Sequence, residues 1–366
     1  MRMNKRVIDG ALKACLSWVA ACAAMSLAVA AVAAELPDTL ARAASTVARP
    51  DQAVLLGLGQ AGKRLVAVGE RGLIAVSDDQ AQRWRQVPVS VSVSLTAVNF
   101  ATPKKGWAVG HRGVILASSD GGDSWTVQLD GRRFAEAALA QVKASAGASQ
   151  RAVADAEALL REGADKPFLD VSFVDEHHGI AVGAYGLCAR TGDGGASWAS
   201  CMAQLPNPQG AHLYAIARSG QKVYIVGEQG LVLRSDDAGA SYSAVPGPYT
   251  TSLFCVAVAG NGDVLLGGLR GTAFISTDQG FRFDALASVS QGGCANAARV
   301  NDGSLLVANQ LGQLLRYGAD KQSLKLMPMP PMAPLSGLLQ TASGSLVLVG
   351  ARGVVSVPAL TSLSTP

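Results

Sequence analysis

One short stretch of the chain, "HRGVILASSDGGDSW" at residues 111–125, has the composition of a catalytic loop. Serine, aspartate and glycine fill a turn that a tryptophan closes, and a carboxylate in such a turn could act as a general acid or base. The same residues could form a structural turn, in which the aspartate accepts backbone hydrogen bonds and glycine adopts a conformation that other residues avoid. A catalytic aspartate would occur once, whereas a structural turn would recur at a fixed spacing.

The stretch recurs along the chain. Similar segments begin at Val68, Val109, Val182, Val226 and Gly267, and two weaker copies begin at Ala308 and Val349. The second glycine of each copy marks the spacing, and successive glycines are 41, 73, 44, 41, 41 and 41 residues apart. The long step equals one period plus 32 residues, so it contains an insertion and the chain has seven repeats. These glycines are Gly72, Gly113, Gly186, Gly230, Gly271, Gly312 and Gly353.

The recurrence favours the structural interpretation of the aspartates. The turn follows the pattern S/T-x-D-x-G-x-x-aromatic and is expected between the third and fourth strands of each unit. Its aromatic residue is expected to pack under the neighbouring unit. The turn aspartates are Asp79, Asp120, Asp193, Asp237 and Asp278, and the closing tryptophans are Trp84, Trp125 and Trp198.

Within a repeat, the pattern is that of short strands. In the second repeat "LTAVNF" alternates apolar and polar residues, "GWAVG" is short and apolar, "GVILASS" begins with β-branched residues and "SWTVQL" closes the unit. Four such strands repeated every 41 residues predict a propeller blade. The 41 glycines also oppose helical repeats. We therefore expect an all-β fold, a seven-bladed β-propeller of four-stranded blades over residues 51–366.

Two segments depart from this pattern. Residues 129–165 form an insertion between the second and third blades that is rich in Ala, Glu, Arg and Leu, and they predict two helices broken near "SAGAS". The last repeat lacks a clear fourth strand, and residues 35–50 could supply one and remove the open sheet edge.

The turn pattern is that of the Asp box of bacterial neuraminidase repeats. The longer stretches "LTAVNFATPKKGWAVGHRGVILASSDGGDSW" and "FLDVSFVDEHHGIAVGAYGLCARTGDGGASW" resemble the photosystem II assembly and stability factor family. Members of that family are lumenal seven-bladed propellers that help to assemble a membrane complex. The resemblance covers about residues 51–358 and implies a non-catalytic scaffold with a protein partner.

A sialidase-like glycoside hydrolase or a glycan-binding propeller is the alternative, because sialidases also carry Asp boxes. Sialidase chemistry needs an arginine triad, a tyrosine nucleophile and acidic helpers in one central pocket, and no sialidase motif beyond the Asp box is visible. His177 and His178 are adjacent and would point apart, and no C-x-x-C occurs, so no metal site is expected. We expect neither enzymatic activity nor a cofactor.

The turn between the second and third strands of each unit is the better candidate for binding. The residue before its second glycine is Arg71, Arg112, Tyr185, Gln229, Arg270, Leu311 or Arg352. If the last blade closes on the first, Arg352, Arg71 and Arg112 lie on consecutive blades and could capture carboxylates of a partner. Solvated turn arginines are the simpler interpretation. The predicted partner-binding residues are Arg71, Arg112, Arg270, Arg352 and Tyr185, with the helical insertion on the same face.

The cysteines carry a separate prediction. Cys188 and Cys201 flank the "TGDGGAS" turn, and a hairpin would bring them opposite each other as a disulfide. Cys255 and Cys294 lie near the inner strands of neighbouring blades, where a second bridge could form.

The first 34 residues have the pattern of a signal peptide. Basic residues precede an apolar run from Ala14 to Ala34, and small residues end it. A signal anchor is one alternative, and a lipoprotein signal is another, because Val19–Cys22 resembles a lipobox. Without this segment, which holds four basic residues and one acidic residue, the net charge falls from +4 to +1, which gives no support for nucleic-acid binding.

These observations together predict an exported, periplasmic and monomeric scaffold with no transmembrane segment in the mature chain. It is expected to bind a protein partner, a membrane complex or one of its subunits, in the cell envelope.

Overall fold

The computed structural model describes residues 38–163, 165–317 and 321–358. The chain divides into two compact units, Met1–Asp38 and Thr39–Pro366, and the account below concerns the second. The predicted signal peptide and its lipobox lie outside the described residues. Within the described part of the chain, no helix is both long and apolar enough to cross a membrane.

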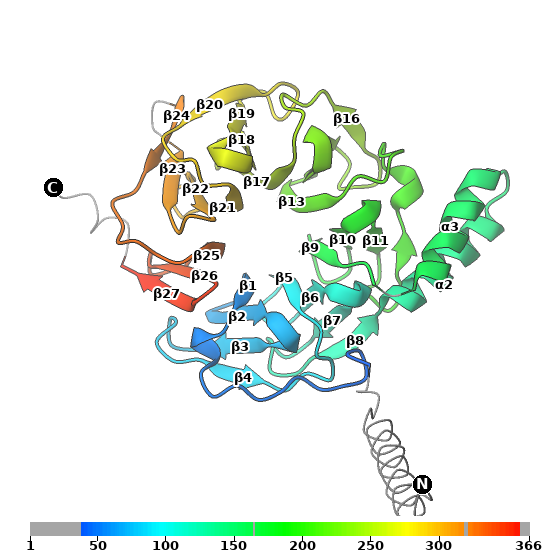
Figure 1. Ribbon diagram of the computed structural model, residues 1–366, viewed down its shortest axis with the longest axis horizontal. Helices are drawn as coiled ribbons and strands as arrows, with labels where there is room; N and C mark the ends of the chain where they lie inside the picture. The colour runs from blue at the N-terminus through cyan, green and yellow to red at the C-terminus, as the bar shows by residue number, and fades with distance from the viewer. Residues whose placement is uncertain (1–37, 164, 318–320, 359–366) are drawn as a thin grey trace, which may run out of the picture. The chain divides into compact units, whose positions relative to one another are not determined.

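The second unit is a β-propeller, in which small antiparallel sheets are arranged in a ring (Figure 1). The first sheets are formed by β1 (Leu55–Ala61), β2 (Arg64–Gly69), β3 (Ile74–Ser77) and β4 (Arg85–Val87), then by β5 (Leu95–Phe100), β6 (Gly106–Gly110), β7 (Ile115–Ser118) and β8 (Thr126–Leu129). Next come β9 (Phe168–Phe173), β10 (Gly179–Gly183), β11 (Cys188–Thr191) and β12 (Ala199–Ser200), then β13 (Leu213–Ser219), β14 (Lys222–Gly227), β15 (Val232–Ser235) and β16 (Ser243–Val245). The remaining strands are β17 (Leu253–Val258), β18 (Val264–Gly268), β19 (Ala273–Ser276), β20 (Asp284–Ser288), β21 (Cys294–Arg299), β22 (Leu305–Asn309), β23 (Leu314–Tyr317), β24 (Ser323–Leu326), β25 (Leu335–Gln340), β26 (Leu346–Gly350) and β27 (Gly353–Val357).

The described residues form six hydrogen-bonded sheets, whereas seven separate four-stranded sheets were expected. The difference arises because β20 and β24 pair in parallel, with Ala287 opposite Ser323. This pair joins two sets of four antiparallel strands into one eight-stranded sheet. The last sheet, β25–β27, has three strands.

The N-terminal segment does not supply the missing strand. It runs beside the chain that follows β4: the amide of Ala44 donates to the carbonyl of Val89 (2.9 Å), and the amide of Ser92 donates to the carbonyl of Thr39 (2.8 Å). The reason is apolar packing, because Leu40 and Ala44 cover the buried alternate valines of this segment. Residues 39–50 therefore do not add the expected strand to the last sheet, and residues 35–37 lie outside the described part.

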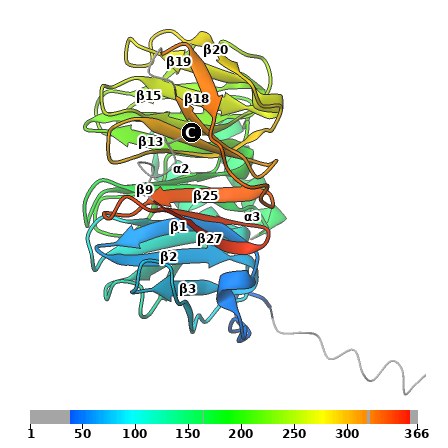
Figure 2. The ribbon, with the colours of Figure 1, turned by 90° about the vertical axis from the view of Figure 1, so that its left-hand side faces the viewer.

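The ring closes by contact between the last and first sheets. β25 lies beside β1 (Figure 2), and the hydroxyl of Ser336 donates to the carbonyl of Leu55 at 2.6 Å. The short helix η1 (Pro50–Gln52) leads into β1 and packs against β27. Residues far apart in sequence thus complete the ring.

The core lies between neighbouring sheets, where each sheet buries apolar residues against the next. One cluster joins Val66 and Val76 of the first sheet to Val98, Leu116 and Trp125 of the second. A buried side chain of this kind contributes about 1.5–3 kcal/mol relative to exposure. These contacts hold the sheets rigidly enough to fix the positions of the turns at both edges.

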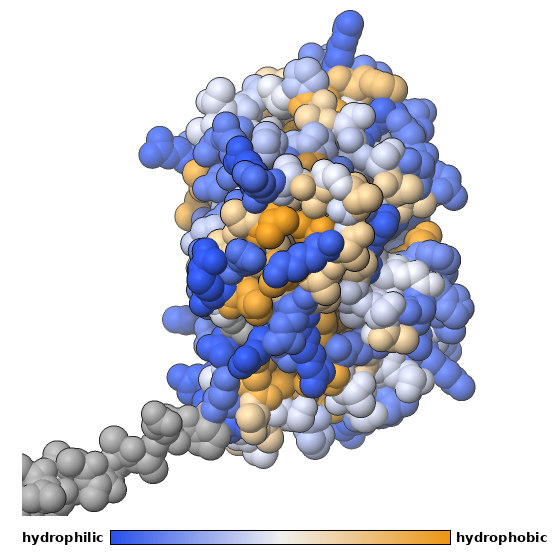
Figure 3. Space-filling model, turned by 90° about the vertical axis from the view of Figure 1, so that its right-hand side faces the viewer, coloured by the Kyte–Doolittle hydropathy of each residue, from blue (hydrophilic) through white to orange (hydrophobic). Residues whose placement is uncertain are grey.

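The insertion forms the two predicted helices, α2 (Gly131–Ala144) and α3 (Gln150–Glu162). The Asp130 side chain caps α2 by accepting the amides of Arg132 and Arg133. α2 also replaces part of a sheet edge, because the Gln141 side chain exchanges two hydrogen bonds of 3.0 Å with the backbone of Ser200 in the short strand β12. The side of the ring that carries the helices shows apolar patches among charged side chains (Figure 3).

Candidate functional site

The turn between the second and third strands has the same backbone conformation in five sheets. The residue before its second glycine has a left-handed φ, which is 55° at Arg71, 62° at Arg112, 56° at Tyr185, 55° at Gln229 and 51° at Arg270. Non-glycine residues adopt this conformation at a cost, so the surrounding structure must impose it. The glycine that follows also has positive φ, and a Cβ at Gly230 would overlap the carbonyl oxygen of Tyr249. The turn is thus pressed against the connection to the next sheet.

We call the edge of the ring formed by these turns and the inter-sheet connections the connector face. The turn residues on it are Arg71, Arg112, Tyr185, Gln229, Arg270, Leu311 and Arg352. Arg71, Arg270 and Arg352 are exposed, and Arg112 is half-buried. Gly353 abuts Asp51 just before β1, so the turns of Arg352, Arg71 and Arg112 lie on three adjoining sheets, as the sequence predicted.

A row of aromatic rings crosses the connector face beside the arginines. Tyr185, 57 % exposed, lies 4.7 Å from the His212 ring. The row continues to Tyr214 at 6.1 Å and then to Phe254, another 4.7 Å away. Lys166 places its ammonium 5.3 Å from the Tyr185 ring. Of these rings only Tyr185 was predicted from the sequence, although Tyr214 and Phe254 both occupy the bulged second position of an inner strand.

The turns that contain the repeated aspartates lie at the opposite edge, which we call the aspartate-turn face. The amide of Gly194 there donates to the carbonyl of His177, in the turn between the first two strands of the same sheet. In this turn Asp193 accepts hydrogen bonds from the hydroxyl of Thr191 (2.8 Å) and from both the amide (2.9 Å) and the hydroxyl (2.6 Å) of Ser197. Asp120 and Asp237 accept the same set of bonds from serines. At Asp79 and Asp278 the preceding serine hydroxyl also donates, but the residue four positions on is an arginine, whose amide donates in the same way.

These hydrogen bonds decide what the turn aspartates can do. The hydroxyl and amide of Ser197, followed by the hydroxyl of Thr191, lower the pKa of Asp193 to about 2. For Asp120 burial acts in the opposite direction, but bonds from Ser124 and Ser118 still lower its pKa to about 2. Such a carboxylate is a weak base whose oxygens are already occupied, so the geometry fits a structural role better than acid–base catalysis.

The closing tryptophans differ in their surroundings. The Trp125 indole is buried and donates to the carbonyl of Gly122 at 3.2 Å, and Trp84 donates to Ala81 at 3.3 Å. Trp198 is buried too, but its indole nitrogen has no hydrogen-bond partner among the described residues.

The structure also pairs the four cysteines of the propeller. Cys188 and Cys201 form a disulfide across the β11–β12 hairpin, with Cα atoms 5.0 Å apart. Cys255 and Cys294 join the neighbouring inner strands β17 and β21, with Cα atoms 6.2 Å apart. Both pairs are those expected from the sequence.

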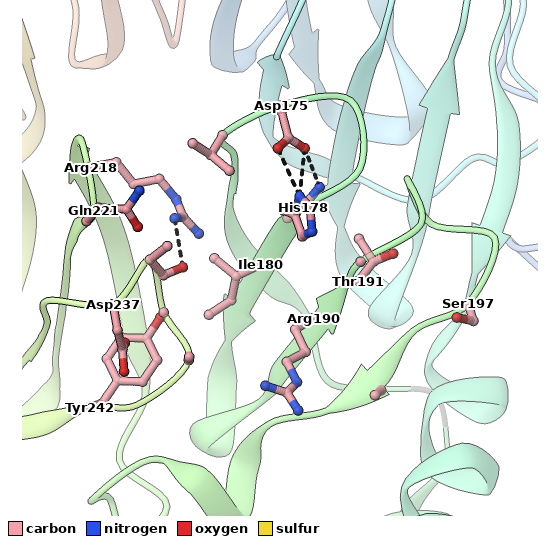
Figure 4. Close-up of a pocket in the computed structure, with 17 residues that line it drawn as sticks. Asp175, His178, Ile180, Arg190, Thr191, Ser197, Arg218, Gln221, Asp237 and Tyr242 are labelled. Atoms are coloured by element: carbon pink, nitrogen blue, oxygen red, sulfur yellow. Dashed lines mark hydrogen bonds and ion pairs between the residues drawn. The ribbon is translucent and has the colours of Figure 1, made fainter.

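An open cleft of about 630 Å³ lies on the aspartate-turn face, between the sheets β9–β12 and β13–β16 (Figure 4). Arg190, Arg218 and Tyr242 line it together with the apolar Ile180. This cleft was not predicted from the sequence, because no sequence motif marks its residues. Elsewhere, no three His, Cys, Asp or Glu side chains of the described residues gather to hold a metal ion.

The ring of sheets and the repeated turns identify the protein as a β-propeller whose connector face carries arginine and aromatic side chains. The sequence model of the family described as Photosynthesis system II assembly factor YCF48 matches residues 76–148 and 151–322. The chain belongs to this family.

Individual relatives match over shorter stretches. The Photosystem II assembly lipoprotein Ycf48 of Synechococcus sp. (strain CC9902) is 30 % identical over 151 residues, which is 39 % of this chain and 44 % of that protein. Its namesake from Picosynechococcus sp. (strain ATCC 27264 / PCC 7002 / PR-6) is 28 % identical over 135 residues, or 35 % of this chain and 31 % of that protein. The chain thus matches less than half the length of these relatives.

Solved structures share the fold. YCF48 bound to D1 peptide superposes with a TM-score of 0.62 at 16 % identity, over 85 % of this chain and 94 % of the other. YCF48 from Cyanidioschyzon merolae gives a TM-score of 0.60 at 16 % identity, over 85 % and 96 % of the two chains.

Proposed function

We propose that this protein is a non-catalytic, exported propeller scaffold that binds a protein partner during assembly or operation of a membrane complex in the cell envelope. The observation that carries the proposal is the connector face. There, turns that share one strained conformation hold the exposed side chains of Arg71, Arg270 and Tyr185. Strain in a repeated surface turn persists only when the structure imposes it, and it is typical of binding surfaces.

The chemistry of the connector face suits a protein segment that is acidic at one end and apolar at the other. The exposed guanidinium groups of Arg352 and Arg71 can each take a carboxylate through two parallel hydrogen bonds, and Arg112 adds a positive charge on the adjoining sheet. The row from Tyr185 to Phe254 offers flat rings to apolar side chains. Arg270 extends the cationic set beyond this row. The relatives support such a role, since they are named photosystem II assembly lipoproteins. A solved structure that shares the fold is described as YCF48 bound to D1 peptide.

We further propose that the ring counts as seven blades and that the protein acts as a monomer. In this count the eight-stranded sheet is two blades, β17–β20 and β21–β24, because each set is antiparallel and spans one sequence repeat. The relatives' lipoprotein names favour a lipid anchor at Cys22 over a freely periplasmic form. A non-catalytic role is supported by the turn aspartates, whose oxygens are occupied within their own turns.

Site-specific crosslinking tests the proposal. A photoreactive phenylalanine analogue at Tyr185 should crosslink to a membrane protein in cells, because this ring is exposed on the connector face. The matched control is the same analogue at Phe281, which is 59 % exposed on the aspartate-turn face. Crosslinks from position 281 with none from position 185 would place the partner on the wrong face for this proposal.

A further inference from the structure

We infer that the cleft between the sheets β9–β12 and β13–β16 binds a small carboxylate with a short apolar body. This site lies on the aspartate-turn face and does not depend on the proposed function of the connector face. The cleft exists because one position on the second strand carries a smaller side chain in this sheet than in the sheets on either side.

An aromatic side chain on the second strand fills the corresponding space in two other sheets. The Trp107 indole on β6 donates to the carbonyl of Gly194 in the next aspartate turn, at 3.3 Å. The Tyr224 hydroxyl on β14 donates to the carbonyl of Gln279 in the turn beyond it, at 2.8 Å. β10 carries Ile180 at the equivalent position, which is shorter and has no donor. The space that Trp107 and Tyr224 fill elsewhere is therefore left as the cleft.

Arg190 faces this space without a protein partner. Its equivalent in the next sheet, Arg234, donates to the carbonyl of Gln279 (3.1 Å), pairs with Asp236 (2.5 Å) and lies 3.8 Å from the Phe281 ring centre. The guanidinium of Arg190 forms no hydrogen bond or ion pair with any residue that the structure describes, and the side chain is exposed. Figure 4 shows its side chain extending into the cleft from β11.

Two further groups in the cleft can serve an anion. Arg218 is held in place by bonds to the hydroxyl of Ser172 (3.0 Å) and to the carbonyl of Ala238 (3.2 Å), and it has no ion pair among the described residues. The Tyr242 hydroxyl is buried and lacks a hydrogen-bond partner in the described part of the chain. Burial raises the pKa of Tyr242 to about 12, so the hydroxyl keeps its proton and can donate it.

The cleft favours a single negative charge over a double one. Asp175 and Asp237 also line it and keep their negative charge. Neither forms an ion pair with Arg190 or Arg218, because their oxygens accept bonds from the amide of His178 and the hydroxyl of Ser241. They would, however, repel a phosphate dianion more than a carboxylate. A guanidinium also matches the two oxygens of a carboxylate. The apolar body of the ligand would lie on Ile180 and its neighbours, in a volume within the usual range of small-molecule sites.

Calorimetric titration of the whole protein tests the inference, with benzoate and inorganic phosphate as probes. We expect saturable benzoate binding that weakens at least tenfold in Arg190→Met and in Tyr242→Phe. Ile180→Tyr should abolish it by filling the cleft as Tyr224 does in the next sheet. Arg234→Met is the matched control, because this arginine is already occupied, and it should bind benzoate as the wild type does.

Three results would overturn the inference. They are no saturable benzoate binding to the wild type, unchanged binding in Arg190→Met, or tighter binding of phosphate than of benzoate. Failure of Ile180→Tyr to fold leaves the other two variants decisive. Changes to the connector-face arginines should leave benzoate binding intact, so this site and the proposed function can fail separately.

Discussion

The hydroxyl of Tyr224 donates a hydrogen bond to the backbone carbonyl of Gln279, 2.8 Å away and 55 residues further along the chain. The ring of Tyr224 is almost fully buried, so this contact ties the sheet β13–β16 to the aspartate turn of the next strands. Blade-to-blade contacts of this kind stabilise the ring, and their absence at Ile180 leaves the cleft.

Tyr224→Phe should lower the free energy of unfolding by about 1 kcal/mol, the usual net contribution of one hydrogen bond. The loss stays small because Arg234 also donates to the Gln279 carbonyl, which keeps that acceptor satisfied. Urea unfolding of wild type and variant measures it. A gain in stability would show that the hydroxyl does not join the two sheets.

The turn aspartates predict loss of stability in acid. Their folded pKa values near 2 for Asp79, Asp120 and Asp193 lie below the unfolded value of about 3.9. Their contribution is therefore present above about pH 4 and disappears as the pH falls toward 2. Asp193→Ala should lower the melting temperature at pH 7 and reduce the fall between pH 4 and pH 2. Identical pH profiles for variant and wild type would rule out this role for the turn.

The buried carboxyl of Asp170 should give the free energy of unfolding the opposite pH dependence. Its carboxylate on β9 accepts the amides of Ile216 (2.7 Å) and Val171 (2.8 Å), yet burial raises its pKa to about 6. A raised pKa means that stability is fully present below about pH 4 and is lost as the pH rises through about 6. Asp170→Asn should remove this fall, while one amide loses its acceptor at a cost of about 1–3 kcal/mol. Chemical unfolding at pH 4 and pH 7 measures both effects, and a fall of wild-type size in the variant contradicts the assignment.

The two disulfides predict that the mature protein has no free thiol. Labelling of unfolded, unreduced protein should find none at Cys188, Cys201, Cys255 or Cys294. Peptide mapping should then recover the pairs 188–201 and 255–294. Four labelled thiols, or any other pairing, would contradict the structure.

The local parts of the fold were predictable because each depends on a few adjacent residues. Turns such as that of Asp120 and the helices after Asp130 follow from short patterns, and the chain folds accordingly. The number of sheets was not predictable, since the pairing of Ala287 with Ser323 depends on how two outer strands meet in space. The path of the N-terminal segment likewise depends on the apolar surface that Val89 presents.

The candidate binding surfaces were also predictable only where they depend on a sequence repeat. The arginines of the connector face could be named because they share one position in a repeat. The aromatic row could not, since His212 meets Tyr185 only after two sheets pack together. The cleft could not be predicted either. Its cause, an isoleucine at position 180 where the next sheet has Tyr224, is visible only when the sheets are superposed, and its two arginines come from different sheets.

The most direct test of the scaffold account is co-purification from detergent-solubilised membranes with Arg71, Arg112 and Arg352 changed together to alanine. The matched control changes Lys63, Lys104 and Arg282 to alanine, which removes the same charge from exposed positions at the other edge of the ring. Quantitative mass spectrometry compares the proteins recovered with each tagged form, below the melting temperature of every variant. The account predicts that the membrane protein recovered with wild type and with the control is lost from the arginine variant. Recovery of that protein by the arginine variant at the wild-type level would contradict it.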